Sequence, residues 1–286
     1  MTPNGILVID KPPGMTSHDV VDRVRKVFGT KKVGHAGTLD PDATGILVLG
    51  LGTATRLLSY AQDGPKRYVA MASFGTTTTT QDASGEVVRE RPVDIDRASL
   101  DAVAQTFVGD IEQVPPMVSA VKVGGERLYK KARRGEEVER RPRPVTIHRL
   151  DVTDFTEDPP SASFDVICSP GTYIRTLVHD IGEKLGCGAH LVRLRRIEGS
   201  GFSEGDAVTL EALSPDHLRP VLEVVRSLPR LEVDEDARRL VSDGRPLVAD
   251  AELPEAQPVA LVCDDRLLAI YKRRGLQLIA EKVLPT

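Results

Sequence analysis

Apolar and polar residues follow two rhythms along the chain, one typical of strands and one typical of helices. Short apolar runs and alternating stretches, bounded by glycine and proline, predict strands. These strands cover residues 5–9, 46–51, 68–74, 117–123, 145–152 and 162–168. Apolar residues at helical spacing predict helices over 17–28, 99–108 and 173–185. Ser17 is the expected N-cap of the first helix, and Gly29 and Gly109 are expected to end the first two.

The order of these elements indicates an α+β fold. Some strands follow one another directly and others are separated by helices, which favours a mixed, largely antiparallel sheet flanked by helices over a regular βαβ repeat. An acidic, proline-rich stretch over 203–229 is a candidate boundary, and short apolar runs after it predict a small β-rich region. We therefore expect a main domain over 1–228 and a small β-rich domain over 229–286.

Composition narrows the class of protein. The 286 residues include 40% hydrophobic and 28% charged residues, enough for one large core and a small appended domain. Three cysteines, odd in number and far apart, argue against a disulfide framework or a structural zinc site. Apolar runs are all too short to cross a membrane. We expect a soluble protein of the reducing cytoplasm.

Charge is distributed unevenly. A net charge of −4 argues against a generally basic nucleic-acid-binding protein. However, the stretch over 23–32 holds five basic residues and no acidic one, and the stretch over 121–149 holds ten basic residues against four acidic ones. A single such run is usually a solvated surface, but two runs on an acidic chain favour a local contact with a polyanion.

Nucleotide and metal motifs are missing from the sequence. Residues 50–55 read GLGTAT, without the third glycine of a dinucleotide site, and no P-loop is present. The histidines lack the spacing of a metal site. We expect no cofactor and no metal.

The loop over 34–45 combines three glycines, a histidine, a carboxylate and a proline between a helix and a buried strand. An aspartate before a proline, such as Asp40, is more often a cap or turn residue. The combination in one short loop nevertheless favours a reactive site.

The pattern Gly34-His35-x-Gly37-Thr38-Leu39-Asp40-Pro41-x-Ala43-Thr44-Gly45 resembles the catalytic motif of the TruB family of tRNA pseudouridine synthases. Four further blocks resemble the family in the same order. They read DKPxGxTS from Asp10, KRYVA from Lys66, QxPPxxSAxKxxGxRxY from Gln113, and CSxGTYIR from Cys168 continuing to Leu194-Arg195-Arg196. Five ordered blocks within residues 5–202 are far more specific than one motif.

The resemblance implies a pseudouridine synthase fold with an RNA-gripping insertion near 113–145 and a PUA-like domain at the C-terminus. It implies an isomerase that converts uridine 55 in the T-loop of tRNA to pseudouridine, without a cofactor. The implied partner is the T-arm of tRNA, with no membrane and no obligatory protein partner, and we expect a monomer.

The resemblance also assigns roles to individual residues. Asp40 is the catalytic carboxylate, Arg175 pairs with it, and Tyr68 stacks on the target base. Asp40 acts on the sugar either covalently or electrostatically, and the sequence leaves both routes open. The implied RNA-binding residues are His35, Lys11, Lys122, Arg127, Tyr129, Lys130, Lys131, Arg133, Arg134, Tyr173, Arg195 and Arg196.

Two alternatives remain. One is a guide-RNA-dependent pseudouridine synthase that works inside a ribonucleoprotein; the chain has no basic tail, which favours a stand-alone enzyme. The other is a catalytically silent tRNA-binding protein. The presence of Asp40, Tyr68 and Arg175 argues against silence.

Overall fold

The computed structural model describes residues 3–119, 122–128, 131, 134–136, 138–250 and 252–285. The chain divides into two compact units. Unit 1 comprises Met1–Pro41, Ile46–Gly64 and Ser200–Thr286, and unit 2 comprises Asp42–Gly45 and Pro65–Gly199. The chain thus passes from unit 1 to unit 2 directly after Pro41, one residue beyond Asp40.

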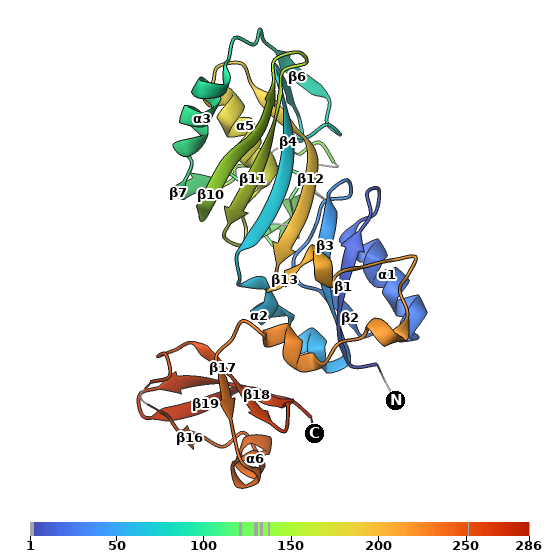
Figure 1. The fold of residues 1–286 in the computed structure, drawn as a ribbon, viewed down its shortest axis with the longest axis vertical. Coiled ribbons are helices and arrows are strands. Elements are labelled where there is room, and N and C mark those ends of the chain that lie inside the picture. Colours follow the sequence, from blue (N-terminus) through green and yellow to red (C-terminus); the bar gives the residue numbers. More distant parts are fainter. Residues whose placement is uncertain are drawn as a thin grey trace. The chain divides into compact units, whose positions relative to one another are not determined.

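Unit 2 is built on an antiparallel sheet with the strand order β12-β4-β11-β10-β7. These strands are β4 (Lys66–Phe74), β7 (Gly109–Gln113), β10 (Arg143–Thr156), β11 (Ser161–Cys168) and β12 (Ala189–Gly199). The helices α3 (Arg97–Gln105) and α5 (Ile174–Lys184) lie together on one face of the sheet (Figure 1). Alternate residues of β4 are buried, because only one face of the antiparallel sheet is covered.

Two hairpins complete unit 2. The strands β5 (Thr76–Thr78) and β6 (Val87–Glu90) form one, and β8 (Lys122–Val123) and β9 (Glu126–Arg127) form the other. The β8–β9 turn consists of Gly124 and Gly125, both with positive φ, as a two-residue hairpin turn of this kind requires.

The N-terminal part of unit 1 is built on three neighbouring strands. They are β1 (Gly5–Lys11), β3 (Thr44–Leu51) and β14 (Val208–Thr209), with β2 (Val33–His35) antiparallel to β3. Helix α1 (Ser17–Phe28) buries an apolar stripe and ends at Gly29, whose left-handed backbone closes the last turn. The shorter helical segments are η1 (Gly52–Arg56), α2 (Leu58–Gln62), η2 (Glu204–Asp206), η3 (Pro215–His217) and η4 (Val221–Val225).

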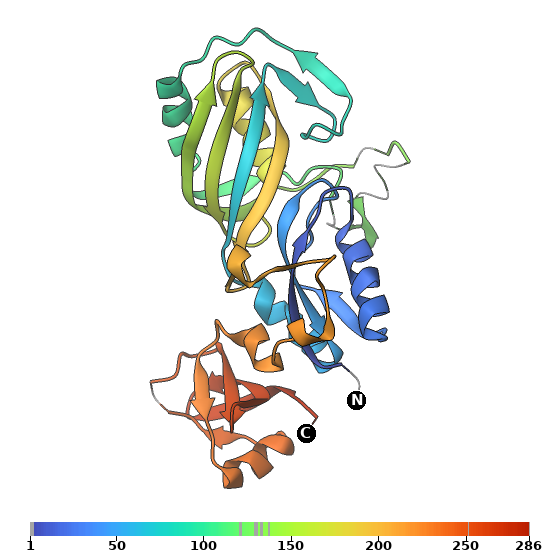
Figure 2. The ribbon, with the colours of Figure 1, turned by 45° about the vertical axis from the view of Figure 1, so that its right-hand side comes forward.

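The C-terminal part of unit 1 is a five-stranded sheet with one helix, α6 (Glu235–Ser242), shown in orange and red in Figure 2. The strands are β15 (Arg230–Glu232), β16 (Leu247–Val248), β17 (Pro258–Cys263), β18 (Arg266–Arg274) and β19 (Gln277–Val283). Strand β17 is apolar throughout because both of its faces are buried. Val259 and Leu261 join the core of this sheet, whereas Ala260 and Val262 join the core that also contains Ile6.

The expected α+β class and the β-rich C-terminal region are confirmed, and the boundary between domains at residue 228 stays a prediction. Most expected strands and helices are present with ends shifted by a few residues. None of the helices in the described part of the chain is long and apolar enough to cross a membrane.

Three local expectations were wrong, and one helix was missed. The N-cap of α1 is Thr16, whose hydroxyl accepts the Asp19 N–H while the Asp19 carboxylate accepts the Thr16 N–H. Helix α3 ends at Gln105, and Gly109 begins β7 instead of closing the helix. The strand expected over 117–123 is not formed at 117–119, and β8 holds only Lys122–Val123, while residues 120 and 121 lie outside the described residues. Helix α6 was not expected.

Candidate active site

Asp40 lies half-buried in the loop that connects β2 and β3. The Ala36 N–H donates to the Val48 carbonyl at 2.8 Å, which ties the start of the loop to β3. Gly37 has a φ of 97°, a left-handed backbone that favours glycine. The loop therefore has a defined path within unit 1 up to Pro41.

Lys11 holds the end of this loop. Its side chain is fully buried, and Nζ donates to the carbonyl oxygens of Met15 (2.7 Å), Pro41 (2.8 Å) and Pro12 (2.9 Å). All three N–H groups of the ammonium are thus bound to backbone. The positive charge of Lys11 therefore stabilises the backbone next to Asp40, and its expected contact with RNA stays a prediction.

Gly45 follows Asp40 at the point where β3 meets β12 within unit 2. Thr44 and Gly45 pair in parallel with Arg195 and Arg196. Gly45 has a φ of 95°, and a Cβ there would lie 2.2 Å from the Arg196 carbonyl oxygen. Only glycine fits, which explains the last residue of the loop motif.

Tyr68 lies on the more buried face of β4. It is opposite Arg196 of β12 and Val166 of β11, so the three side chains share one face of the sheet. Helix α5, which carries Arg175, packs against β12 and β4. Unit 2 therefore places the tyrosine and the arginine on elements that pack together.

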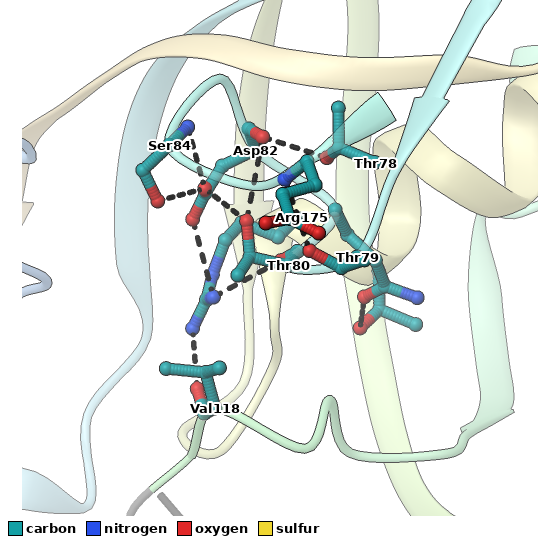
Figure 3. A network of polar contacts seen from close by, with 10 residues as sticks. Thr78, Thr79, Thr80, Asp82, Ser84, Val118 and Arg175 are labelled. Atoms are coloured by element: carbon teal, nitrogen blue, oxygen red, sulfur yellow. Dashed lines mark hydrogen bonds and ion pairs between the residues drawn. The ribbon is translucent and has the colours of Figure 1, made fainter. Parts of the chain in front are cut away.

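Arg175 is the second residue of α5 and is only 4% exposed. Its Nη1 donates to Asp82 Oδ2 and to the Thr80 carbonyl, both at 3.2 Å, and its Nη2 donates to the Val118 carbonyl at 2.8 Å (Figure 3). Arg175 is therefore a buried residue with fixed partners and is not a solvent-exposed arginine at the helix start.

Asp82 is itself held in place. Its Oδ1 accepts the hydroxyls of Thr80 (2.5 Å) and Ser84 (2.6 Å) and the Ser84 N–H (3.1 Å), as Figure 3 shows. Sequence reasoning missed Asp82, because an aspartate two residues before a serine is typical of an Asx turn. The ion pair between Asp82 and Arg175 joins residues 93 positions apart, and the pattern of residue types along the sequence does not indicate it.

The arginines of β12 split between the two faces of the sheet. Arg195 is opposite Val69 and is half-buried, whereas Arg196 is opposite Tyr68 and is only 2% exposed. The two side chains differ in this way because neighbouring strand residues point to opposite faces. Their expected contacts with RNA stay predictions.

The remaining expected RNA contacts lie on several elements. His35 is half-buried in β2, and Tyr173 is the N-cap residue of α5. Lys122 and Arg127 belong to the β8–β9 hairpin, while Lys131 lies after it. Arg134 forms ion pairs with Glu126 (2.8 Å) and Glu136 (2.7 Å). The other three expected contacts, Tyr129, Lys130 and Arg133, lie outside the described residues.

Two cysteine environments bear on the chemistry. Burial raises the pKa of the Cys168 thiol, at the end of β11, to about 11, so it is protonated at neutral pH and is no nucleophile. In the C-terminal sheet, Glu235, Cys263 and Asp264 are the one group of potential metal ligands among the described residues. Glu235 already pairs with Arg238, and burial raises the pKa of Cys263, so this group is poorly suited to a metal.

The mixed sheet with its flanking helices and the β-rich C-terminal sheet define a pseudouridine synthase fold. The family comparison is specific. A model described as "TruB family pseudouridylate synthase (N terminal domain)" matches residues 25–174, and one described as "tRNA pseudouridylate synthase B C-terminal domain" matches residues 175–222. The chain belongs to the TruB family of pseudouridylate synthases.

Curated relatives agree with this assignment. The chain is 49% identical over 255 residues to tRNA pseudouridine synthase B of Syntrophotalea carbinolica, covering 86% of this chain and 83% of that protein. It is 46% identical over 284 residues to the protein of the same name from Thermobifida fusca, covering 95% of each.

Solved structures show the same fold. A Cbf5-Nop10-Gar1 complex contains a chain that matches with a TM-score of 0.78 at 28% identity, covering 99% of this chain and 86% of that one. A chain of an H/ACA RNP bound to a substrate RNA containing 2′-deoxyuridine matches with a TM-score of 0.77 at 26% identity, covering 98% and 85%.

Proposed function

We propose that this protein converts uridine 55 in the T-loop of tRNA to pseudouridine. The observation that carries the proposal is family membership together with Asp40, Tyr68 and Arg175 at the positions of the family's motifs. The burial of Arg175 beside Asp82 supports it, because a guanidinium kept out of water interacts strongly with carboxylates.

The reaction breaks the bond from ribose C1′ to N1 and forms one from C1′ to C5. C5 loses its proton and N1 gains one, so the change is an isomerisation without redox chemistry. Asp40 acts at C1′, either as a nucleophile or by stabilising positive charge on the sugar. Both routes need an ionised Asp40, and a bidentate partner such as Arg175 favours that state.

Tyr68 and the basic residues complete the proposed mechanism. Tyr68 stacks on the target base and stands close to C5, where a proton must leave. The uridine has to be extruded from its stack, and phosphate contacts offset the cost of unstacking. We assign these contacts to the RNA-gripping insertion near 113–145, to Arg195 and to the C-terminal domain, which we take to be PUA-like.

The chain acts alone in this proposal, as a cytoplasmic monomer on the T-arm. A guide-RNA-dependent enzyme is the second candidate, because the matching Cbf5 chain was solved in a complex with Nop10 and Gar1. The names of the curated relatives favour the stand-alone reading.

One assay tests the proposal. The purified chain is incubated with a tRNA transcript that carries tritium at C5 of its uridines, and released tritium is counted. We expect release from one uridine per tRNA, without added RNA, protein or metal, and none from a transcript with cytidine at position 55. No release would contradict the proposal, and release only with a guide RNA would favour the second candidate.

A further inference from the structure

Two polar side chains without an assigned role each hold both backbone groups of a residue close to Asp40 or Arg175. Ser17 binds the N–H and the carbonyl of Leu39, and Gln113 binds the N–H and the carbonyl of Tyr173. We propose that Ser17 and Gln113 are positioning residues that set the direction of Asp40 and Arg175. This inference rests on the proposed function of those two residues.

The Ser17 contact joins the first turn of α1 to the residue before Asp40. Its Oγ accepts the Leu39 N–H at 2.9 Å and donates to the Leu39 carbonyl at 3.1 Å. Ser17 and Leu39 are both 3% exposed, so no water replaces these bonds easily. The peptide that leads into Asp40 is thus fixed by one hydroxyl on a capped helix.

This position needs such an anchor. Leu39 lies in a loop outside the strands, where a buried backbone N–H and carbonyl need partners. Lys11 holds Pro41 on the other side of Asp40. With both neighbours held, rotation of the backbone at Asp40 is restricted, and its carboxylate is aimed before RNA binds.

The Gln113 contact does the same at the start of α5. Gln113 is the last residue of β7 and is only 1% exposed. Its Oε1 accepts the Tyr173 N–H at 2.9 Å and its Nε2 donates to the Tyr173 carbonyl at 3.3 Å. Tyr173 is the N-cap of α5 and makes no side-chain cap of its own, so Gln113 holds the helix end two residues before Arg175.

The test compares each positioning residue with a matched control. Ser17→Ala is paired with Thr16→Ala, which removes the adjacent hydroxyl that caps the same helix. Gln113→Ala is paired with Gln105→Ala, whose Nε2 makes one bond to the Leu150 carbonyl. For each protein, melting temperature, tRNA Kd and single-turnover tritium release at saturating enzyme are measured.

We expect Ser17→Ala and Gln113→Ala to lower the single-turnover rate by about 10- to 100-fold, because small displacements of reacting groups are costly. The Kd should change by less than about twofold, since both side chains are buried against backbone groups. The melting temperature of the two control variants should fall, with little change in their single-turnover rate. Equal rate losses in variants and controls, or unchanged rates in the variants, would overturn the proposal.

Conservative variants keep the test decisive if an alanine variant does not fold. Ser17→Cys retains the size and a weaker donor, so its rate should lie between wild type and a tenfold loss. In Gln113→Glu, the carboxylate can accept the Tyr173 N–H but donates to the carbonyl only when protonated. Its rate relative to wild type should therefore rise as the pH falls, and a flat ratio would count against the inference. An inactive wild-type protein would instead overturn the proposed function.

Discussion

Lys11 in unit 1 and Arg175 in unit 2 are both buried cations, but their surroundings differ. Lys11 Nζ is bound by three backbone carbonyl oxygens, whereas Arg175 is bound by the Asp82 carboxylate and two carbonyls. An ammonium has three N–H groups, and all of those of Lys11 serve the backbone. A guanidinium has five in a plane, which gives it a fixed direction toward its acceptors.

The difference in surroundings indicates a different role for each of the two cations. Lys11 acts through the backbone, so the effect of its removal is structural. Arg175 is proposed to act on the reacting carboxylate, so we expect the effect of its removal to be chemical. The following substitutions test this distinction, from the largest expected effect to the smallest.

Asp40→Asn removes the carboxylate with which Arg175 is proposed to pair and beside which Lys11 holds the backbone. Asn retains the size but not the negative charge, so tritium release should fall by about 10³-fold or more. Binding of tRNA should stay within a few-fold of wild type. Substantial turnover, with deamidation excluded by mass spectrometry, would show that Asp40 is not the essential carboxylate.

Arg175→Lys tests whether direction matters beyond charge. An ammonium keeps the positive charge but not the planar fork, so we expect a loss of about 100-fold in single-turnover rate. Asp82→Asn should cause a smaller loss, because the other contacts of Arg175 remain. A lysine variant with wild-type rate would remove the distinction between the two cations.

Lys11→Met tests the structural side of the comparison. It removes the donor to three buried carbonyls, and we expect a free energy of unfolding lower by about 2–4 kcal/mol, measured by urea unfolding. The salt dependence of tRNA binding should be unchanged in the folded variant. A reduced slope would instead show that Lys11 contacts phosphate, as the resemblance implies.

The basic residues expected to contact RNA should behave in the opposite way. Replacing Lys130, Lys131, Arg133 and Arg134 by alanine should weaken tRNA binding and flatten its salt dependence by up to about 0.9 in slope per lost contact. The single-turnover rate at saturating enzyme should change less. Because Arg134 pairs with Glu126 and Glu136, its own share should be the smaller, which an Arg134→Ala variant measures.

Asp165→Asn should cause the smallest change, a small decrease in the free energy of unfolding. Hydrogen bonds from Arg67 lower the pKa of Asp165, so its ion pair stabilises the fold above the unfolded pKa and is lost as the pH falls through the folded value. The variant should lose about 1 kcal/mol at pH 7, as partly exposed pairs do. The difference in unfolding free energy should vanish at strongly acidic pH, and a constant difference would exclude this ion pair as its cause.

The sequence by itself predicts whatever depends on neighbours along the chain. The apolar stripe of α1 before Gly29 and the alternation along β4 each contain the information that forms the element. Ordered motif blocks also indicate Asp40, Tyr68 and Arg175, because each lies within its own short pattern. These local features were enough for the fold class and the family.

Only the tertiary structure decided which distant groups meet. Asp82 holds Arg175, Lys11 holds Pro41, and Gly45 approaches the Arg196 carbonyl so closely that no side chain fits. Each contact depends on a distance in space between residues far apart in the chain. Charge and hydrogen-bonding groups find partners within a few ångströms, and the pattern of residue types along a sequence contains no such distance.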